Sequence, residues 1–514
     1  MTRILLLAAL VLVLGAAPAS AAAPYEDARL PVHKRVDDLL SRMTLEEKVG
    51  QMTQTERFQF EPDAANPGRN ETPITTYGLG SVLSGGGSTP AAGNNPTAWA
   101  DMVDRFQAAA LKTRLKIPLL YGVDSVHGHG NLLGATVFPH NIGLGATRDP
   151  DLVRRIAKIT GEETLASGPQ WTFSPCICAA RDDRWGRTYE SFSEDARLVE
   201  RYETAIDGYQ DGGVLATAKH YAGDGDTEYG TSVGAYKIDQ GVTITSREDF
   251  WRHSLRQYVP AIQKHGVETV MPSFSSVDWT EDGVGNPLKM HAHRELITDV
   301  LKGRLKFGGF VISDWEGIHQ IPGDWATQVR TGANAGIDMF MEPNAYTTFI
   351  PALIAEVQAN RVPESRIDDA VRRILRQKFE AGLFERPFVD RRKTDEIGSP
   401  QHRRVARKAV AKSQVLLKNE HRTLPLSKRE DVYVAGSNAD NIGNQAGGWT
   451  LTWQGGSTNV IPGQTILDGI EDAARGDVTF SADASAAVGR RDHGVVVVGE
   501  IPYAEGFGDI GGPR

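Results

Sequence analysis

Residues 308–317 read GGFVISDWEG, and this stretch decides the fold class. Phe310, Val311 and Ile312 form an apolar run that is too short for a free-standing helix and is bounded by glycines. Such a run is typical of a strand buried on both faces. Asp314 follows the run directly, at the position where α/β folds place their chemistry. The alternative role for this aspartate is the N-cap of the next helix.

Similar short apolar segments recur along the chain. They lie at 49–53, 81–84, 118–124, 171–175, 215–220, 269–274, 310–314 and 337–342. Amphipathic segments of helical length separate most of them, at 99–114, 149–167, 195–211 and 291–306. Eight buried strands alternating with helices predict an α/β fold of the (β/α)₈ TIM-like barrel type. An open doubly wound sheet is the alternative, but the glycine-rich phosphate turn that would follow its first strand is absent from the sequence.

The chain divides into four predicted parts. The barrel domain covers 24–385; it opens with a helix capped by Thr44 and Glu47 and closes with a helix over 365–383 that Ser365 and Asp368 cap. A basic linker and helix occupy 386–420. A second α/β sandwich domain covers 421–514, with strands at 431–435, 478–481 and 493–499. Three strands make a poor domain, so we expect this one to be incomplete and the sequence to be truncated at its C-terminus.

The fourth part is a signal peptide at residues 1–23, with one arginine, an apolar core and a small-residue end, cut between Ala21 and Pro24. Its apolar run, residues 4–14, is too short to span a bilayer. We therefore expect a secreted or periplasmic protein without a membrane partner. The net charge of −9 argues against nucleic acid as a partner of the chain as a whole.

The only two cysteines are Cys176 and Cys178. With one intervening residue, a disulfide between them is expected to be strained and is not predicted. No histidine pattern beside them suggests a zinc site, so neither a metal nor another cofactor is expected.

Polar and aromatic side chains collect at the predicted strand ends. They are Asp124, Arg187, Lys219, His220, Met271, Phe274, Asp314 and Trp315. A pyranose needs donors and acceptors for its hydroxyls and an apolar surface for its ring face, so the set suits a sugar. Each polar residue also has a structural alternative: a helix cap for Asp124, an internal ion pair for Lys219, and a salt-bridge cluster for Arg187 with Glu190. No Gly-x-Ser-x-Gly elbow or metal triad is present.

Lys219 and His220 are adjacent, and adjacent residues of a regular strand point to opposite faces. Both can touch one sugar only where the backbone is irregular. We therefore predict a bulge or an unusual peptide bond at this pair.

The motifs YGVDSVHGHGN, RDDRWGRTYESFSED, AKHYAGDG, GFVISDWEGI and GGWTLTWQG occur in this order. With them the sequence, from about Tyr25 to Arg514, resembles glycoside hydrolase family 3, and within it the β-glucosidases and exo-acting β-glucan glucohydrolases. The resemblance implies a barrel followed by an (α/β)₆ sandwich with the active site between them. The chain departs from the plant members at Phe274, where they have tyrosine, and at 319–320, where they have an arginine nearby.

The resemblance also implies roles for individual residues. Asp314 would be the nucleophile of a retaining glycosidase, and Glu505 the general acid/base; Glu500 is the rival acid. Glucose hydroxyls would be held by Asp124, Arg187, Lys219 and His220. Trp315 and Trp453 would enclose the next sugar. A retaining mechanism needs two carboxyl groups about 5–5.5 Å apart.

The leading functional hypothesis is a secreted exo-acting β-glucosidase that releases glucose from β-glucans or β-glucosides. One alternative is a glucan-binding or weakly active fragment that lacks a firmly held acid. The other is a β-N-acetylhexosaminidase of the same family, which would carry Lys-His-Phe-Pro-Gly where this chain reads KHYAGDGDTEYG.

Overall fold

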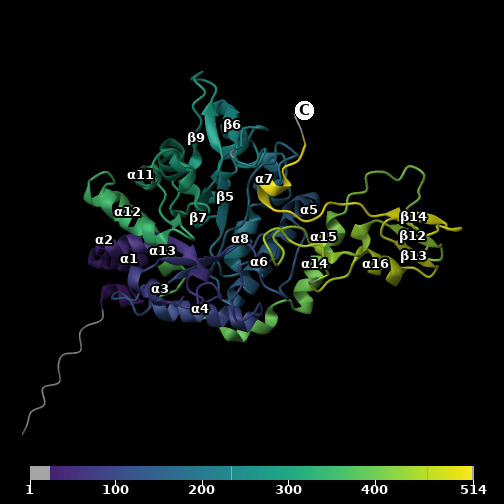
Figure 1. Cartoon of the computed structure of the whole chain (residues 1–514), viewed down its shortest axis with the longest axis horizontal. Helices are drawn as coiled ribbons and strands as arrows, with labels where there is room; N and C mark the ends of the chain where they lie inside the picture. The colour runs from purple at the N-terminus through teal and green to yellow at the C-terminus, as the bar shows by residue number, and fades with distance from the viewer. Residues whose placement is uncertain (1–22, 233, 460, 512–514) are drawn as a thin grey trace, which may run out of the picture.

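The computed structural model describes residues 23–232, 234–459 and 461–511. The predicted signal peptide, up to residue 22, lies outside the described residues. Within the described ranges, no helix is both long and apolar enough to cross a membrane. Figure 1 shows a large lobe built from the first part of the chain and a smaller lobe built from the last part.

The large lobe is a closed barrel of parallel strands, as the sequence predicts. Its strands are β1 (Thr53–Glu56), β2 (Ser81–Ser84), β3 (Leu120–Val123), β4 (Trp171–Thr172), β5 (Thr217–Tyr221), β7 (Thr269–Pro272), β10 (Phe310–Val311) and β11 (Phe340–Met341). They pair in the orders β11-β1-β2-β3-β4 and β10-β7-β5. Two parallel bridges, Trp171 with Leu215 and Ile312 with Met339, join these sheets into a ring. Residues of these strands and of the helices around them form the main apolar core.

The first predicted strand, at 49–53, is wrong. The Thr44–Glu47 capping box is present and starts α2 (Leu45–Gln51), which continues through Val49, so β1 begins only at Thr53. Val49 and Met52 are apolar at helical spacing and are both buried. The helix signal therefore outweighs the short apolar run.

Helices follow most strands and surround the barrel (Figure 1). They are α1 (Val32–Arg42), α3 (Thr72–Tyr77), α4 (Pro96–Ala110), α5 (Asn141–Ala146), α6 (Pro150–Ser167), α7 (Ala196–Tyr202), α8 (Thr204–Asp211), α9 (Arg247–Phe250), α10 (Tyr258–Gln263), α11 (Trp325–Ala335), α12 (Tyr346–Gln358) and α13 (Glu364–Glu380). The helix predicted at 195–211 is split into α7 and α8 at Glu203, and the one at 291–306 is a π-helix, η6 (Glu295–Arg304). The cap predicted at Ser365 is wrong: Pro363 is the N-cap of α13 and makes no side-chain cap bond.

The backbone at Lys219 and His220 is irregular, which confirms the prediction. The peptide bond between them is cis, and the register of β5 against β7 shifts between Lys219 and Tyr221. Both side chains line the same cavity, described below.

An insertion that the sequence did not reveal forms a separate sheet beside the barrel. Its strands are β6 (Val242–Thr245), β8 (Ser276–Trp279) and β9 (Leu288–Lys289), with β6 parallel and β9 antiparallel to β8. Figure 1 shows β6 and β9 projecting from one end of the large lobe.

The small lobe contains a parallel sheet in the order β13-β12-β14. Its strands, β12 (Val432–Ala435), β13 (Val478–Ser481) and β14 (His493–Val496), lie where the sequence predicts strands. Helices α15 (Ile442–Ala446) and α16 (Ile466–Ala473) complete it. Helix α14 (Pro400–Ser413), which precedes this lobe in the chain, packs against α5 and α6 of the large lobe. After β14 the chain returns to the barrel, as the last yellow segment of Figure 1 shows, and forms the short helix η10 (Glu505–Gly508) there.

The expectation for the cysteines is wrong, because Cys176 and Cys178 form a disulfide. Residues i and i+2 of an extended segment point to the same side, which brings the two sulfurs together. The Cα atoms are 5.5 Å apart, inside the usual range for a disulfide. The segment also bridges β5, because Ile177 N donates to the carbonyl of Lys219.

Candidate active site

A cavity of about 700 Å³ opens at the carboxyl ends of the barrel strands, where the returning C-terminal segment meets them. Every predicted site residue lines it: Asp124, Arg187, Lys219, His220, Met271, Asp314, Trp315, Trp453 and Glu505. The barrel supplies most of this set, and the C-terminal region supplies Trp453 and Glu505. Segments far apart in the sequence therefore form one site.

Asp314 follows β10 and presents a carboxyl group to the cavity. Its Oδ1 accepts a hydrogen bond from Trp315 N at 2.7 Å, while its Oδ2 is buried and has no hydrogen-bond partner among the described residues. That Oδ2 lies 3.8 Å from His220 Nε2. Burial raises the pKa of Asp314 to about 6, against the opposing effect of Arg187. Asp314 is not the cap of the following helix, whose N-cap is Glu316.

Glu505 enters the same cavity from the C-terminal side. It is the first residue of η10, with a left-handed φ of 56°, and its Oε1 lies 3.4 Å from Arg187 Nη1. Burial is the largest cause that raises its pKa, to about 8, and the charges of Asp239 and Asp314 add to this effect while Arg187 opposes it. Glu500 is not among the residues that line this cavity, and its Oε2 accepts from the Tyr503 hydroxyl.

Arg187 is the centre of a buried ionic cluster. Its guanidinium donates to both carboxylate oxygens of Glu190, from Nε at 2.9 Å and from Nη2 at 3.0 Å. Burial alone would raise the pKa of Glu190, but Arg187 and Lys219 hold it below its usual value. Trp449 Nε1 also donates to Glu190. Arg187 thus forms the salt bridge that was the structural alternative, and the same guanidinium also lines the cavity.

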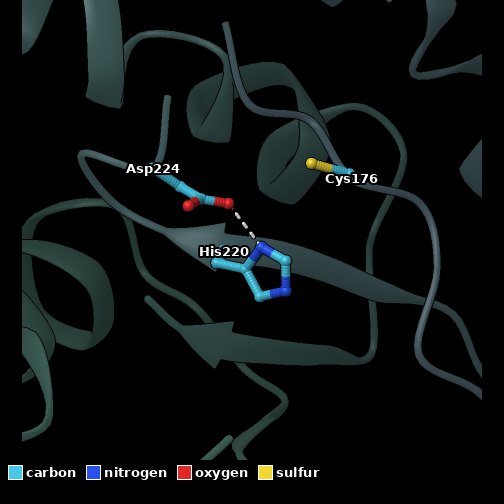
Figure 2. A group of neighbouring side chains, drawn as sticks. All are labelled: Cys176, His220 and Asp224. Atoms are coloured by element: carbon cyan, nitrogen blue, oxygen red, sulfur yellow. Dashed lines mark hydrogen bonds and ion pairs between the residues drawn. The ribbon is translucent and has the colours of Figure 1, made fainter. Parts of the chain in front are cut away.

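His220 is oriented by partners at both ring nitrogens. Nδ1 pairs with Asp224, as Figure 2 shows, and Nε2 lies 3.2 Å from Arg187 Nη2. Arg187 can only donate, so Nε2 is the acceptor and Nδ1 carries the proton given to Asp224. Burial holds the pKa of His220 well below its usual value and raises that of Asp224 to about 7. The neutral ring therefore keeps a fixed tautomer.

Cys176 lies beside this pair, and its sulfur, His220 and Asp224 offer atoms within 4.8 Å of one another (Figure 2). Such a group can hold a metal ion only if the cysteine is a thiolate. The Cys176 sulfur is bonded to Cys178, so this ligand is blocked in the present structure.

The cavity has polar and aromatic walls. Lys219 Nζ lies 3.5 Å from Asp124 Oδ1 and 5.8 Å from the centre of the Trp449 ring. Trp453 lies edge-on to Phe507, with 5.4 Å between the ring centres. Trp315 packs over Gly85, where an added Cβ would lie 2.8 Å from Cζ3 of the indole. Indole faces beside charged donors and acceptors match the two surfaces of a pyranose.

Several cavity residues were not singled out as sugar ligands from the sequence. They are Glu56, Phe58, Tyr236, Gln240, His319, Gln320 and Trp449. Trp449 shares the segment GGWTLTWQG with Trp453, which was the available signal. Tyr236 and Gln240 lie in the loop between β5 and β6. They do not directly follow a barrel strand, so the position of the strands could not predict them. Phe274 and Gln320, where the family resemblance predicts a departure from the plant members, both line the cavity.

Comparison with known proteins identifies the family. Residues 44–377 match the glycosyl hydrolase family 3 N terminal domain, and residues 414–509 match the glycosyl hydrolase family 3 C-terminal domain. The chain belongs to glycosyl hydrolase family 3. The family 3 barrel and C-terminal domain thus correspond to the two lobes described above.

Individual relatives within family 3 agree with this result. The lysosomal beta glucosidase of Dictyostelium discoideum is 33% identical, over 92% of this chain and 62% of the relative. The periplasmic beta-glucosidase/beta-xylosidase of Dickeya chrysanthemi is 31% identical, over 80% of this chain and 68% of the relative.

Among solved structures, the exo-1,3/1,4-beta-glucanase of a Pseudoalteromonas species has a TM-score of 0.85 and 38% identity, over 93% of this chain and 60% of that one. A beta-glucosidase from Listeria innocua in complex with glucose has a TM-score of 0.77 and 28% identity, over 93% of this chain and 66% of that one. The chain thus spans less than two thirds of the Dictyostelium and Pseudoalteromonas proteins.

Proposed function

We propose that this chain is a secreted or periplasmic, retaining, exo-acting β-glucosidase that releases glucose from β-glucans or β-glucosides through a covalent glycosyl-enzyme. The observation that carries the proposal is the presence of Asp314 and Glu505 in one cavity with separated pKa values, about 6 and about 8. At neutral pH one carboxyl is ionised and the other protonated, which is the pairing that glycoside hydrolysis needs.

In this mechanism Asp314 attacks the anomeric carbon through Oδ2, the oxygen without a hydrogen bond to any described residue. Glu505 protonates the leaving oxygen and then, as the carboxylate, takes a proton from the water that hydrolyses the glycosyl-enzyme. Arg187 lowers the pKa of both carboxyls by its charge. Asp124 offers acceptors and Lys219 donors to the sugar hydroxyls, with His220 beside them in the cavity wall, and Trp315 and Trp453 offer apolar faces to the next sugar.

The relatives support the substrate class. Those named above are called β-glucosidases, β-xylosidases or β-glucanases, and the Listeria enzyme is described with glucose. A variant of it is described with laminaribiose, a β-linked glucose disaccharide. A location outside the cytoplasm is supported by the periplasmic Dickeya relative and by the signal-like N-terminus.

The test is the variant Asp314→Ala, assayed on 4-nitrophenyl β-glucoside with and without sodium azide. We expect turnover to fall at least about 1000-fold, since the variant lacks the covalent route. Azide should restore part of it and yield α-glucosyl azide. Turnover equal to the parent enzyme would refute the assignment of Asp314.

A second measurement addresses the acid. Glu505→Gln should slow substrates with poor leaving groups, while the matched variant Glu500→Gln, in the same segment, should not. The anomer released first by the parent enzyme, followed by NMR, should be β. Faster cleavage of the N-acetylglucosaminide than of the glucoside would favour the hexosaminidase alternative instead.

A further inference from the structure

The segment that carries Glu505 is fastened to the barrel by a second carboxylate, that of Asp509. Its Oδ1 accepts a hydrogen bond from Gly186 N at 2.8 Å. Its Oδ2 accepts from three consecutive backbone amides, Lys237 N at 2.9 Å, Ile238 N at 2.7 Å and Asp239 N at 2.8 Å. One side chain thus receives four backbone donors from two barrel loops.

Both loops contribute to the site. Gly186 precedes Arg187, whose Nη1 lies 3.4 Å from Oε1 of Glu505. The other loop carries Asp239, whose charge helps to raise the pKa of Glu505, and is followed by the cavity residue Gln240. Asp509 therefore binds the two backbone segments that determine where the neighbours of Glu505 lie.

The docking is close at the Glu505 end as well. A Cβ added to Gly186 would lie 2.0 Å from the carbonyl oxygen of Glu505, so only glycine permits this approach. Gly506 packs against the Tyr236 ring in the same way. Ile510 N donates to Arg184 O, and the Tyr229 hydroxyl donates to Gly511 O. Residues 505–511 thus lie on the barrel loops rather than on the small lobe.

A carboxylate suits this position because ionised oxygens only accept, and all four neighbours donate. An amide of the same shape would keep only one accepting oxygen. Its NH₂ group would face either the single N–H of Gly186 or the three N–H groups of 237–239, depending on how the amide is oriented. The change from Asp509 to asparagine therefore weakens the fastening without altering side-chain size.

We propose that Asp509 is a positioning residue, which places Glu505 for proton transfer by clamping its segment to the Gly186 and 237–239 backbones. This inference rests on the proposed function, in which Glu505 is the general acid/base. Asp509 itself need not touch substrate.

The test compares two leaving groups in the variant Asp509→Asn. Phenyl β-glucoside needs a proton on its leaving oxygen, whereas 2,4-dinitrophenyl β-glucoside does not. A displacement of about 1 Å can cost roughly 100-fold in rate, so we expect a loss of tens of fold or more for the phenyl substrate. For the dinitrophenyl substrate we expect less than about threefold loss of the glycosylation rate, because general acid catalysis contributes nothing there. Azide should accelerate the variant on this substrate.

The matched control is Asp483→Asn, a carboxylate of the C-terminal region that accepts from Ser485 N away from the cavity. It should leave both rates unchanged. Asp509→Glu, which retains the charge on a longer side chain, should give the same leaving-group contrast to a smaller degree, and it serves if the asparagine variant does not fold. Equal losses on both substrates, or no loss, would overturn the proposal.

The inference and the proposed function fail in different ways. If the parent enzyme hydrolyses neither glucoside, the proposed function is wrong. If the parent is active and Glu505→Gln shows the leaving-group contrast, but Asp509→Asn does not, only the role of Asp509 is wrong.

Discussion

Arg187 and Glu505 face each other inside the cavity, with 3.4 Å between Nη1 of the guanidinium and Oε1 of the carboxyl. The first residue lies in a barrel loop and the second in the returning C-terminal segment. The same guanidinium holds Glu190 by two hydrogen bonds. One buried cation thus links a barrel loop, the candidate acid and a second buried carboxylate.

We expect Arg187→Gln to reduce both stability and activity. Removing the cation leaves Glu190 buried without its main partner, and breaking a buried pair in this way costs about 3–5 kcal/mol. Because Arg187 lowers the pKa of Glu505, its loss should also move the basic limb of kcat/KM to higher pH. Urea unfolding and the pH profile measure the two effects. Arg197→Gln, an exposed arginine paired with Asp195, is the control and should change neither.

The pH dependence of the parent enzyme follows from the two cavity carboxyls. Asp314 must be ionised, so kcat/KM should fall as pH decreases through its pKa of about 6. Glu505 must be protonated, so kcat/KM should fall as pH increases through its pKa of about 8. A bell with its maximum near pH 7 is expected for 4-nitrophenyl β-glucoside. A basic limb that survives in Glu505→Gln would show that another group causes it.

The barrel could be predicted because buried parallel strands are short apolar runs with clear ends. The run at Ser81–Ser84 coincides with β2, and the run at Val478–Ser481 in the small lobe coincides with β13. The prediction failed where two local signals compete, as at Val49, and where a strand is half exposed, as in β6. The proposed boundaries of the domains stay predictions.

Only part of the site could be read from strand ends. Asp124 and Asp314 follow buried strands and Lys219 lies within β5, so the barrel topology brings them to one rim. Glu505 was expected only through the family resemblance, because its position depends on how a distant loop docks on the barrel. Asp224 accepts from the His220 ring and so fixes its orientation. The sequence shows only that it lies four residues after His220, which does not predict this contact. The functional roles of all these residues stay proposals.

Gly85, which lies behind the Trp315 ring, offers a test of whether Trp315 contacts the second sugar. Gly85→Ala would place a Cβ 2.8 Å from Cζ3 of the indole, closer than carbon atoms approach, so the ring must shift into the cavity. We expect kcat/KM for laminaribiose to fall about tenfold, which corresponds to about 1.4 kcal/mol. The control is Gly68→Ala, where nothing lies within 4 Å of the added Cβ. If Gly85→Ala lowers the rate on laminaribiose no more than Gly68→Ala, Trp315 does not contact the second sugar.

Glu203, between α7 and α8, gives a prediction for stability rather than activity. Its side chain is buried, and neither carboxyl oxygen has a hydrogen-bond partner among the described residues. Burial, with a smaller contribution from Glu200, raises its pKa to about 10. The unfolded chain loses this proton near its ordinary pKa of 4.5, so above that pH the unfolded state binds fewer protons and the folded protein loses stability as pH rises.

Glu203→Gln removes this ionisation while keeping the size of the side chain. The variant should match the parent near pH 4.5 and become progressively more stable than the parent up to about pH 8. The difference should grow by at most about 1.4 kcal/mol per pH unit. Urea unfolding at about pH 5, 6.5 and 8 measures it, with the exposed Glu248→Gln as the control. A stability difference that stays constant over this range would mean that Glu203 is already ionised in the folded protein.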